Sequence, residues 1–146
     1  MTRLRQIALI VVAASTGVVG LWATAAPQSF YDDFPGMGRV WVAVDGPFNE
    51  HLVRDVGGLN LGLAFVAVLA LVTGSVLLGR AAGGAALLYG GPHLLYHALN
   101  TDGYDTSDAV ASLASLTIAA LAALLALASP SGPEEGISGR RERPAR

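Results

Sequence analysis

The chain has 146 residues, of which 53% are hydrophobic and only 14% are charged, whereas soluble domains carry about 25% charged residues. Cysteine and lysine are both absent, which excludes disulfides, thiolate chemistry and Schiff-base chemistry. The formal net charge of −2 excludes the strongly basic face that nucleic-acid binding requires. The composition therefore predicts one small domain that lies in a lipid bilayer.

Four apolar runs reach the length that crosses a membrane, since about 20 apolar residues span a hydrocarbon core of roughly 30 Å. We predict helices at about 7–26, 52–79, 81–99 and 107–128. The expected fold class is an all-α membrane protein, with a single four-transmembrane-helix bundle formed by residues 1–128. The remaining residues, 129–146, are rich in Pro, Gly, Arg and Glu, which predicts a disordered cytoplasmic tail.

The first apolar run has a second interpretation. Arg3 and Arg5, the apolar stretch and the sequence ATA at 23–25 also resemble a cleaved signal peptide. The stretch of about 19 residues exceeds the about 7–15 apolar residues of such peptides, which favours a retained helix. Cleavage would leave three helices.

The arginines set the predicted orientation, because cytoplasmic segments of membrane proteins carry an excess of positive charge. With a cytoplasmic N-terminus, only Arg39 and Arg54 lie outside. The other seven of the nine arginines lie inside: Arg3, Arg5, Arg80, Arg140, Arg141, Arg143 and Arg146. Both termini are therefore predicted to be cytoplasmic, with the helices in a plasma membrane.

The outer loop 27–50 is the longest segment between predicted helices and is rich in aromatic and turn-forming residues. Residues 40–44 alternate around Trp41 as a short strand would, but a single strand has nothing to pair with. We expect an extracytoplasmic cap that lies on the outer face of the bundle.

Two connections and two small-residue motifs predict how the helices meet. A short inner connection at Gly79-Arg80 makes the second and third helices an antiparallel hairpin, and Asp105 or Thr106 is the expected N-cap of the fourth. Small residues that permit close helix approach recur in the second and fourth helices, at Gly58 and Gly62 and at Ala111, Ser115 and Ala119. They would serve packing within the bundle or a homo-oligomer.

Polar residues concentrate at the predicted outer end. His93 and His97 are four residues apart and share one helix face, which Tyr89 continues. His51 and Asp55 share a face of the second helix in the same way, as do Glu50 and Arg54. Because the hairpin brings the outer ends together, the candidate polar site is Glu50, His51, Arg54, Asp55, Tyr89, His93 and His97.

Three interpretations of this site stay open. Its residues could form ion pairs and hydrogen bonds that hold the cap, or His51, His93, His97 and Asp55 could bind a divalent metal or other cofactor. His93, about 9 Å inside the membrane at 1.5 Å per residue, could instead belong to a path for protons or a polar substrate. Asn60 is a second polar group within the membrane, and Pro92 should kink the third helix beside His93.

Three sequence stretches carry a resemblance: SFYDDFPG at 29–36, GPFNEHLVRDVGGL at 46–59 and PHLLYH at 92–97. They resemble a group of uncharacterised small four-helix membrane proteins of actinobacteria, and the layout is distantly similar to the DoxX-like membrane proteins. This resemblance implies the helix topology and no activity.

The expected function is therefore a structural or accessory component of the membrane. Its partners would be the lipid bilayer and a larger membrane complex or a second copy of the chain. The alternatives are a metal- or cofactor-dependent redox protein and a small oligomeric transporter or proton-coupled element. The sequence alone leaves open whether the chain is an enzyme.

Overall fold

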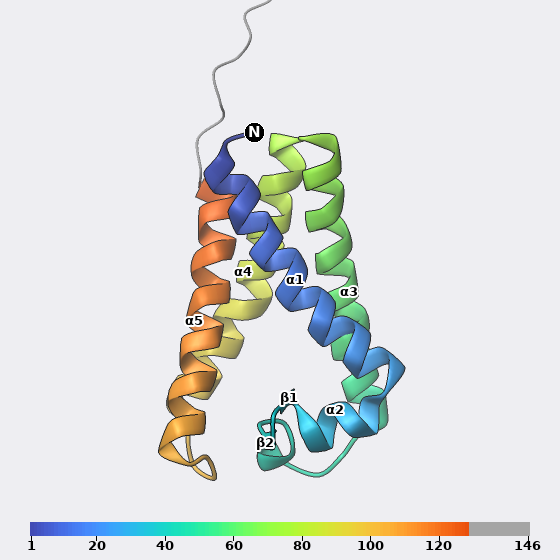
Figure 1. Cartoon of the computed structure of the whole chain (residues 1–146), viewed down its shortest axis with the longest axis vertical. Coiled ribbons are helices and arrows are strands. Elements are labelled where there is room, and N and C mark those ends of the chain that lie inside the picture. Colours follow the sequence, from blue (N-terminus) through green and yellow to red (C-terminus); the bar gives the residue numbers. More distant parts are fainter. Residues whose placement is uncertain (129–146) are drawn as a thin grey trace, which may run out of the picture.

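The computed structural model describes residues 1–128, so the predicted tail at 129–146 lies outside the described residues. The described chain is almost entirely helical, which confirms the all-α fold class (Figure 1). Its elements, in chain order, are α1 (Arg3–Ala25), α2 (Pro27–Asp33), β1 (Pro35–Gly36), β2 (Arg39–Val40), the single-turn 3₁₀ helix η1 (Ala43–Asp45), α3 (Glu50–Thr73), α4 (Val76–Leu99) and α5 (Thr106–Ala128).

The four long helices run between two ends that differ in structure. The N-terminus, the turn between α3 and α4 and the last turn of α5 lie at one end, called here the turn end (Figure 1). Residues 26–49 and the loop 100–105 lie at the opposite end, the cap end.

The turn between α3 and α4 lies at Gly74-Ser75, so the prediction of a connection at Gly79-Arg80 was wrong. Gly74 ends α3 in the left-handed conformation, with φ 67°, which favours glycine. Ser75 is the N-cap of α4, and its side chain accepts a hydrogen bond of 3.2 Å from the Leu78 N–H. These two caps place Gly79 and Arg80 inside α4.

Glycines decide which helices pair. α1 packs most closely with α3, and α4 with α5, while contacts between α3 and α4 are fewer. A Cβ at Gly57 would lie 2.8 Å from the Thr24 nitrogen in α1, and one at Gly83 would lie 2.6 Å from the Ala123 oxygen in α5. At both crossings the backbones therefore touch, whereas the ribbons of α3 and α4 separate toward the cap end (Figure 1).

The predicted small-residue motifs do not mediate packing within the bundle, so that interpretation was wrong, while their use in a homo-oligomer stays a prediction. A Cβ at Gly58 or Gly62 would meet nothing within 4 Å. In α5 the buried residues are Ser112, Ala122, Ala123 and Ala126, not the predicted ladder of Ala111, Ser115 and Ala119. Small residues occur on every face of these helices, so their spacing alone does not reveal which face is packed.

The two ends have different cores. Near the turn end a cluster of buried apolar side chains, chiefly alanine, includes Leu9 and Val12 from α1. Near the cap end a smaller cluster forms around Ala23, Phe30 and Val53, and aromatic rings pack against it. The rings of Trp22, Phe30 and Phe34 contact one another, and Phe34 also contacts Trp41. The distances between ring centroids are 4.8 to 6.1 Å.

Arg5 is fully buried at the turn end, although it was expected among the charges that flank the membrane. Its Nε donates a hydrogen bond of 3.0 Å to the Ala126 carbonyl in the last turn of α5. Carbonyls in a last helical turn have no partner within their own helix. Gly79 leaves room for this side chain, since a Cβ there would lie 3.0 Å from the Arg5 Cδ.

The segment 26–49 is folded over the cap end, as predicted. It consists of α2, a hairpin that pairs Pro35 with Val40 and Gly36 with Arg39, and η1. A strand at 40–44 was set aside for want of a partner, but Val40 belongs to β2, which pairs with β1, while residues 43–45 are helical. We call residues 26–49 the cap.

Three of the described helices, α1, α3 and α5, are long and apolar enough to cross a membrane. α4 has the length, at 24 residues, but carries Arg80, two tyrosines, two histidines and Pro92. Its helical hydrogen bonding continues past Pro92 to Leu99.

A candidate polar site at the cap end

The predicted site residues lie at or near the cap end, but their contacts fall into two sets. Glu50, His51, Arg54 and Asp55 form the first turns of α3, beside α1, whereas Tyr89, His93 and His97 lie on α4, beside α5. The reason is the helix pairing described above. A hairpin between α3 and α4 was expected to join the two sets, and the glycine contacts instead favour α1–α3 and α4–α5.

In the α3 set, Arg54 connects α3 to α1. Its Nε donates a hydrogen bond of 2.8 Å to Glu50 Oε1, and its Nη1 donates one of 2.5 Å to the Thr24 carbonyl. Thr24 lies in the last turn of α1, where carbonyls lack partners within the helix. This arginine therefore caps α1, and Glu50 orients it.

His51 and Asp55 form a second pair on α3 that faces away from the other residues. Their side chains are 3.2 Å apart and are 87% and 62% exposed. A contact between side chains this exposed contributes little to stability.

In the α4 set, aromatic and imidazole rings form a column along the helix. Tyr89 stacks on His93 at 5.8 Å between ring centroids, and His93 meets His97 edge-on at 4.8 Å. His97 in turn contacts Tyr104 of the α4–α5 loop at 6.1 Å. The predicted shared face of His93 and His97 is therefore confirmed, and we call Tyr89, His93, His97 and Tyr104 the ring column.

Asn60 lies beside Tyr89, at the end of the ring column that is farther from the cap. Its side chain is 2% exposed, and its Nδ2 lies 3.2 Å from the Tyr89 hydroxyl and 2.9 Å from the Val56 carbonyl. This contact connects α3 to α4 near mid-helix. It gives the buried amide the partners that a polar group needs away from water.

The cap covers the other end of the column through Tyr104, which the sequence analysis did not identify. The Tyr104 hydroxyl donates a hydrogen bond of 2.6 Å to the Trp41 carbonyl. Burial, followed by the charge of Asp45, raises the pKa of Tyr104 to about 12.

An ion pair between Arg39 of β2 and Asp108 of α5 forms a second connection between the cap and the α4–α5 pair. Asp108 also belongs to the N-terminal turn of α5, where its backbone N–H donates a hydrogen bond of 2.9 Å to Asp105 Oδ1. Asp105, one of the two residues predicted for this role, is thus the N-cap, and this hydrogen bond and one from Ser107 lower its pKa.

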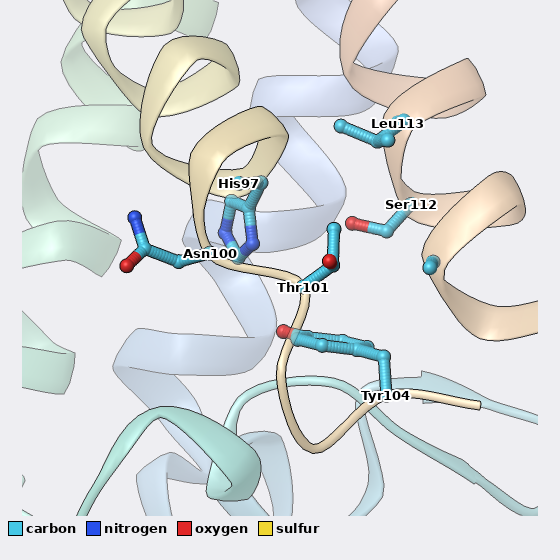
Figure 2. A pocket seen from close by; sticks show the side chains of 7 residues that line it. His97, Asn100, Thr101, Tyr104, Ser112 and Leu113 are labelled. Carbon is cyan, nitrogen blue, oxygen red and sulfur yellow. The ribbon is translucent and has the colours of Figure 1, made fainter. Parts of the chain in front are cut away.

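A small polar hollow lies where α4, α5 and their loop meet. It is lined by His97, Asn100, Thr101, Tyr104, Ala109, Ser112 and Leu113. In Figure 2, Ser112 and Thr101 point into the space between His97 and α5, while the Asn100 side chain points away. The volume of about 10 Å³ is that of about one water molecule.

The structure does not assemble the predicted metal site of His51, His93, His97 and Asp55. Within residues 1–128, no three His, Asp or Glu side chains are grouped so that they could hold one metal ion. The expected ligands lie on helices that pair with different neighbours. His51 is solvent-exposed, while His93 and His97 contact aromatic rings.

Comparison with known proteins identifies no relative: no family model, no curated protein and no solved structure matches the chain. The resemblance to small actinobacterial membrane proteins therefore stays a prediction.

Proposed function

We propose that this chain is a four-span protein of the bacterial plasma membrane and acts as a structural or accessory component of a larger membrane complex. Its N-terminus and the end of α5 would lie on the cytoplasmic side, and the cap outside. In this proposal α1 is a retained helix, because it supplies Leu9, Val12 and Ala23 to the two cores.

The separation of charge between the two ends carries the membrane proposal. Of the five arginines in residues 1–128, Arg3, Arg5 and Arg80 lie toward the turn end, where this range has no acidic side chain, and Arg39 and Arg54 lie toward the cap end. All eight acidic residues of this range lie toward the cap end: Asp32, Asp33, Asp45, Glu50, Asp55, Asp102, Asp105 and Asp108. Basic residues on one side of apolar helices are typical of a cytoplasmic face.

α4 supports a fourth span despite its polar residues. At about 1.5 Å per residue, its 24 residues reach about 36 Å, which exceeds the roughly 30 Å of the hydrocarbon core. Polar groups within a membrane usually face neighbouring helices. Tyr89 contacts Asn60 of α3, and His97 contacts Tyr104 beside α5.

Single cysteines test the topology, and the natural chain contains none to remove. Met37→Cys places a thiol at the tip of the cap, at a residue that is 94% exposed, and Thr73→Cys places one beside the turn. A membrane-impermeant maleimide should label Met37→Cys in intact cells and Thr73→Cys only after permeabilisation. The opposite pattern, or labelling of both in intact cells, contradicts the proposed topology.

The accessory role is supported by the contacts that the polar residues make. Arg54, Tyr104, Arg39 and Asn60 make their contacts within the chain, and the hollow beside His97 has room only for a water. The experiment is purification in mild detergent with mass measurement of the intact particle. We expect a particle that contains further subunits, and a particle of one 14.9 kDa chain would contradict this role.

The ring column favours a proton-coupled element as the second candidate. It extends from the cap to Asn60, and between Asn60 and the buried Arg5 at the turn end the core is a cluster of apolar side chains. A complete path would therefore have to form between copies. Proton flux into proteoliposomes that is lost in His93→Ala would support this candidate, and unchanged flux would contradict it.

A further inference from the structure

An apolar groove runs between α1 and α5 in the half of the molecule near the turn end. Its volume is about 220 Å³. Each helix supplies residues at positions i, i+3, i+4 and i+7, so both walls follow one helix face. The lining residues are Leu4, Ile7, Ala8 and Val11 from α1 and Ile118, Leu121, Ala122 and Leu125 from α5.

The shape of this groove is a narrow slot between two ridges. Ala8 and Ala122 are buried, at 3% and 7% exposure, whereas the larger side chains of Ile7 and Ile118 are about 60% exposed. The slot extends for seven residues, or about 11 Å. It fits a thin, flexible hydrocarbon chain better than a second helix of about 10 Å diameter, which would need small residues along the ridges.

The charges at the mouth of the groove indicate the headgroup of its occupant. Arg3 is exposed and directly precedes Leu4, which lines the groove. Residues 1–31 contain no acidic side chain that could pair with Arg3 along α1. A basic residue at the mouth of an apolar slot between membrane helices complements a lipid with an anionic headgroup.

We infer that the α1–α5 groove binds one acyl chain of an anionic phospholipid from the cytoplasmic leaflet, whose phosphate pairs with Arg3. This inference rests on the proposed membrane topology, which places the turn end in the cytoplasmic leaflet. The lipid would cover the apolar ridges and connect α1 to α5 at the end where the two helices meet.

The test is retention of lipid by the purified full chain, measured by native mass spectrometry after exchange into micelles with phosphatidylglycerol or phosphatidylcholine. The native chain should retain one phosphatidylglycerol in preference to phosphatidylcholine. Arg3→Gln should lower phosphatidylglycerol retention about fivefold and leave phosphatidylcholine unchanged. Arg80→Gln is the matched control, because it removes the same charge from the same end but from α4.

A second pair of variants tests the slot. Ile7→Phe should narrow it and reduce retention of both lipids, while Ile10→Phe should change neither. Ile10 is the matched control because it lies on the same helix and is 55% exposed, against 61% for Ile7, but does not line the groove. Both changes are at exposed positions, which preserves the fold.

Three results would overturn the inference: equal retention of the two lipids, equal effects of Arg3→Gln and Arg80→Gln, or a lipid-free dimer that Ile7→Phe dissociates. The last result would assign the groove to a second copy of the chain. Carbonate extraction of cell membranes separates this failure from that of the proposed function. A chain that stays in the membrane but retains no lipid contradicts only the groove inference, whereas a chain released by carbonate contradicts both.

Discussion

The turn end and the cap end hold the same four long helices together by different means. At the turn end, alanines, Gly83 and the buried Arg5 bring the helix backbones together. At the cap end α1 still touches α3 at Gly57, but the α1–α3 and α4–α5 pairs separate from each other, and aromatic rings, one ion pair and single hydrogen bonds connect the two pairs through the cap. Backbone contact leaves little freedom, whereas side-chain contacts at a surface break one at a time. The turn end should therefore determine stability, and the cap end should respond to pH and to surface substitutions.

The largest expected effect comes from adding a methyl group at the closest helix crossing. In Gly83→Ala, the new Cβ would lie 2.6 Å from two backbone atoms of α5, so the helices must move apart. We expect a loss of about 3 kcal/mol in the free energy of unfolding, measured by circular dichroism in micelles.

Gly62→Ala is the control for this prediction. It adds the same group to α3, where nothing lies within 4 Å. A mid-helix alanine there should stabilise the protein by about 0.5–1 kcal/mol. Similar effects of the two substitutions would contradict the assignment of Gly83 to a tight crossing.

Arg5→Met tests the buried arginine at the turn end. The variant leaves the Ala126 carbonyl without its hydrogen bond, which should cost about 2 kcal/mol of the free energy of unfolding. Arg80→Met, on the exposed side of α4, should have no measurable effect. The chain has two tryptophans, Trp22 and Trp41, both in the aromatic contacts of the cap end. Their fluorescence in the folded state should be unchanged in Arg5→Met, and a shift would show that the ends are not independent.

The Arg39–Asp108 ion pair should contribute less, because the two side chains are 36% and 15% exposed. A double-mutant cycle with Arg39→Gln and Asp108→Asn should give a coupling free energy of about 0.5–1 kcal/mol. Tryptophan fluorescence should shift in both single variants, since the cap loosens, while helix content stays constant. A coupling free energy near zero would show that the cap is held without this pair.

These two ends also differ in how far the sequence could predict them. Helices were predictable because apolar runs are a local property, and the N-cap Asp105 was predictable because its partner is three residues away. The turn at Gly74-Ser75 also had a local signal, a C-terminal glycine followed by an N-capping serine, which the charge of Arg80 obscured. Arg5 is spaced from Ala8, Leu9 and Val12 as one buried helix face, so its burial could have been recognised too.

The candidate site was less predictable because it depends on which helices pair. Contact of Gly57 with Thr24, and of Gly83 with Ala123, joins residues far apart in the chain, and neighbouring glycines such as Gly58 offer the same sequence pattern. Neither Tyr104 nor Asp45 belongs to a recognisable sequence motif. Tyr104 binds the Trp41 carbonyl in the cap, and Asp45 of the cap affects the pKa of Tyr104, so both interactions join separate segments. The column of His93 and His97 was predictable from their spacing on one helix, but its continuation into the cap was not.

The smallest expected effect is a pH response confined to the cap end. The pKa of Tyr104 is raised to about 12, from about 10 for an ordinary tyrosine. Because the unfolded chain loses this proton first, the stabilisation is complete below about pH 10 and is lost as the pH rises toward about 12. Tryptophan fluorescence should therefore change within this window before helix content does, since Tyr104 bonds the cap at Trp41, whereas backbone contacts at Gly83 hold the helices at the turn end.

Two variants separate Tyr104 from the other tyrosines in this titration. Tyr104→Phe should abolish the early fluorescence change, because the ionising hydroxyl that binds the Trp41 carbonyl is gone. Asp45→Asn should move the midpoint to lower pH, since the Asp45 charge raises the pKa of Tyr104. That shift should be modest, because burial is the larger cause. If fluorescence and helix content instead change together in every variant, the cap is not an independent region, and the distinction between the two ends fails.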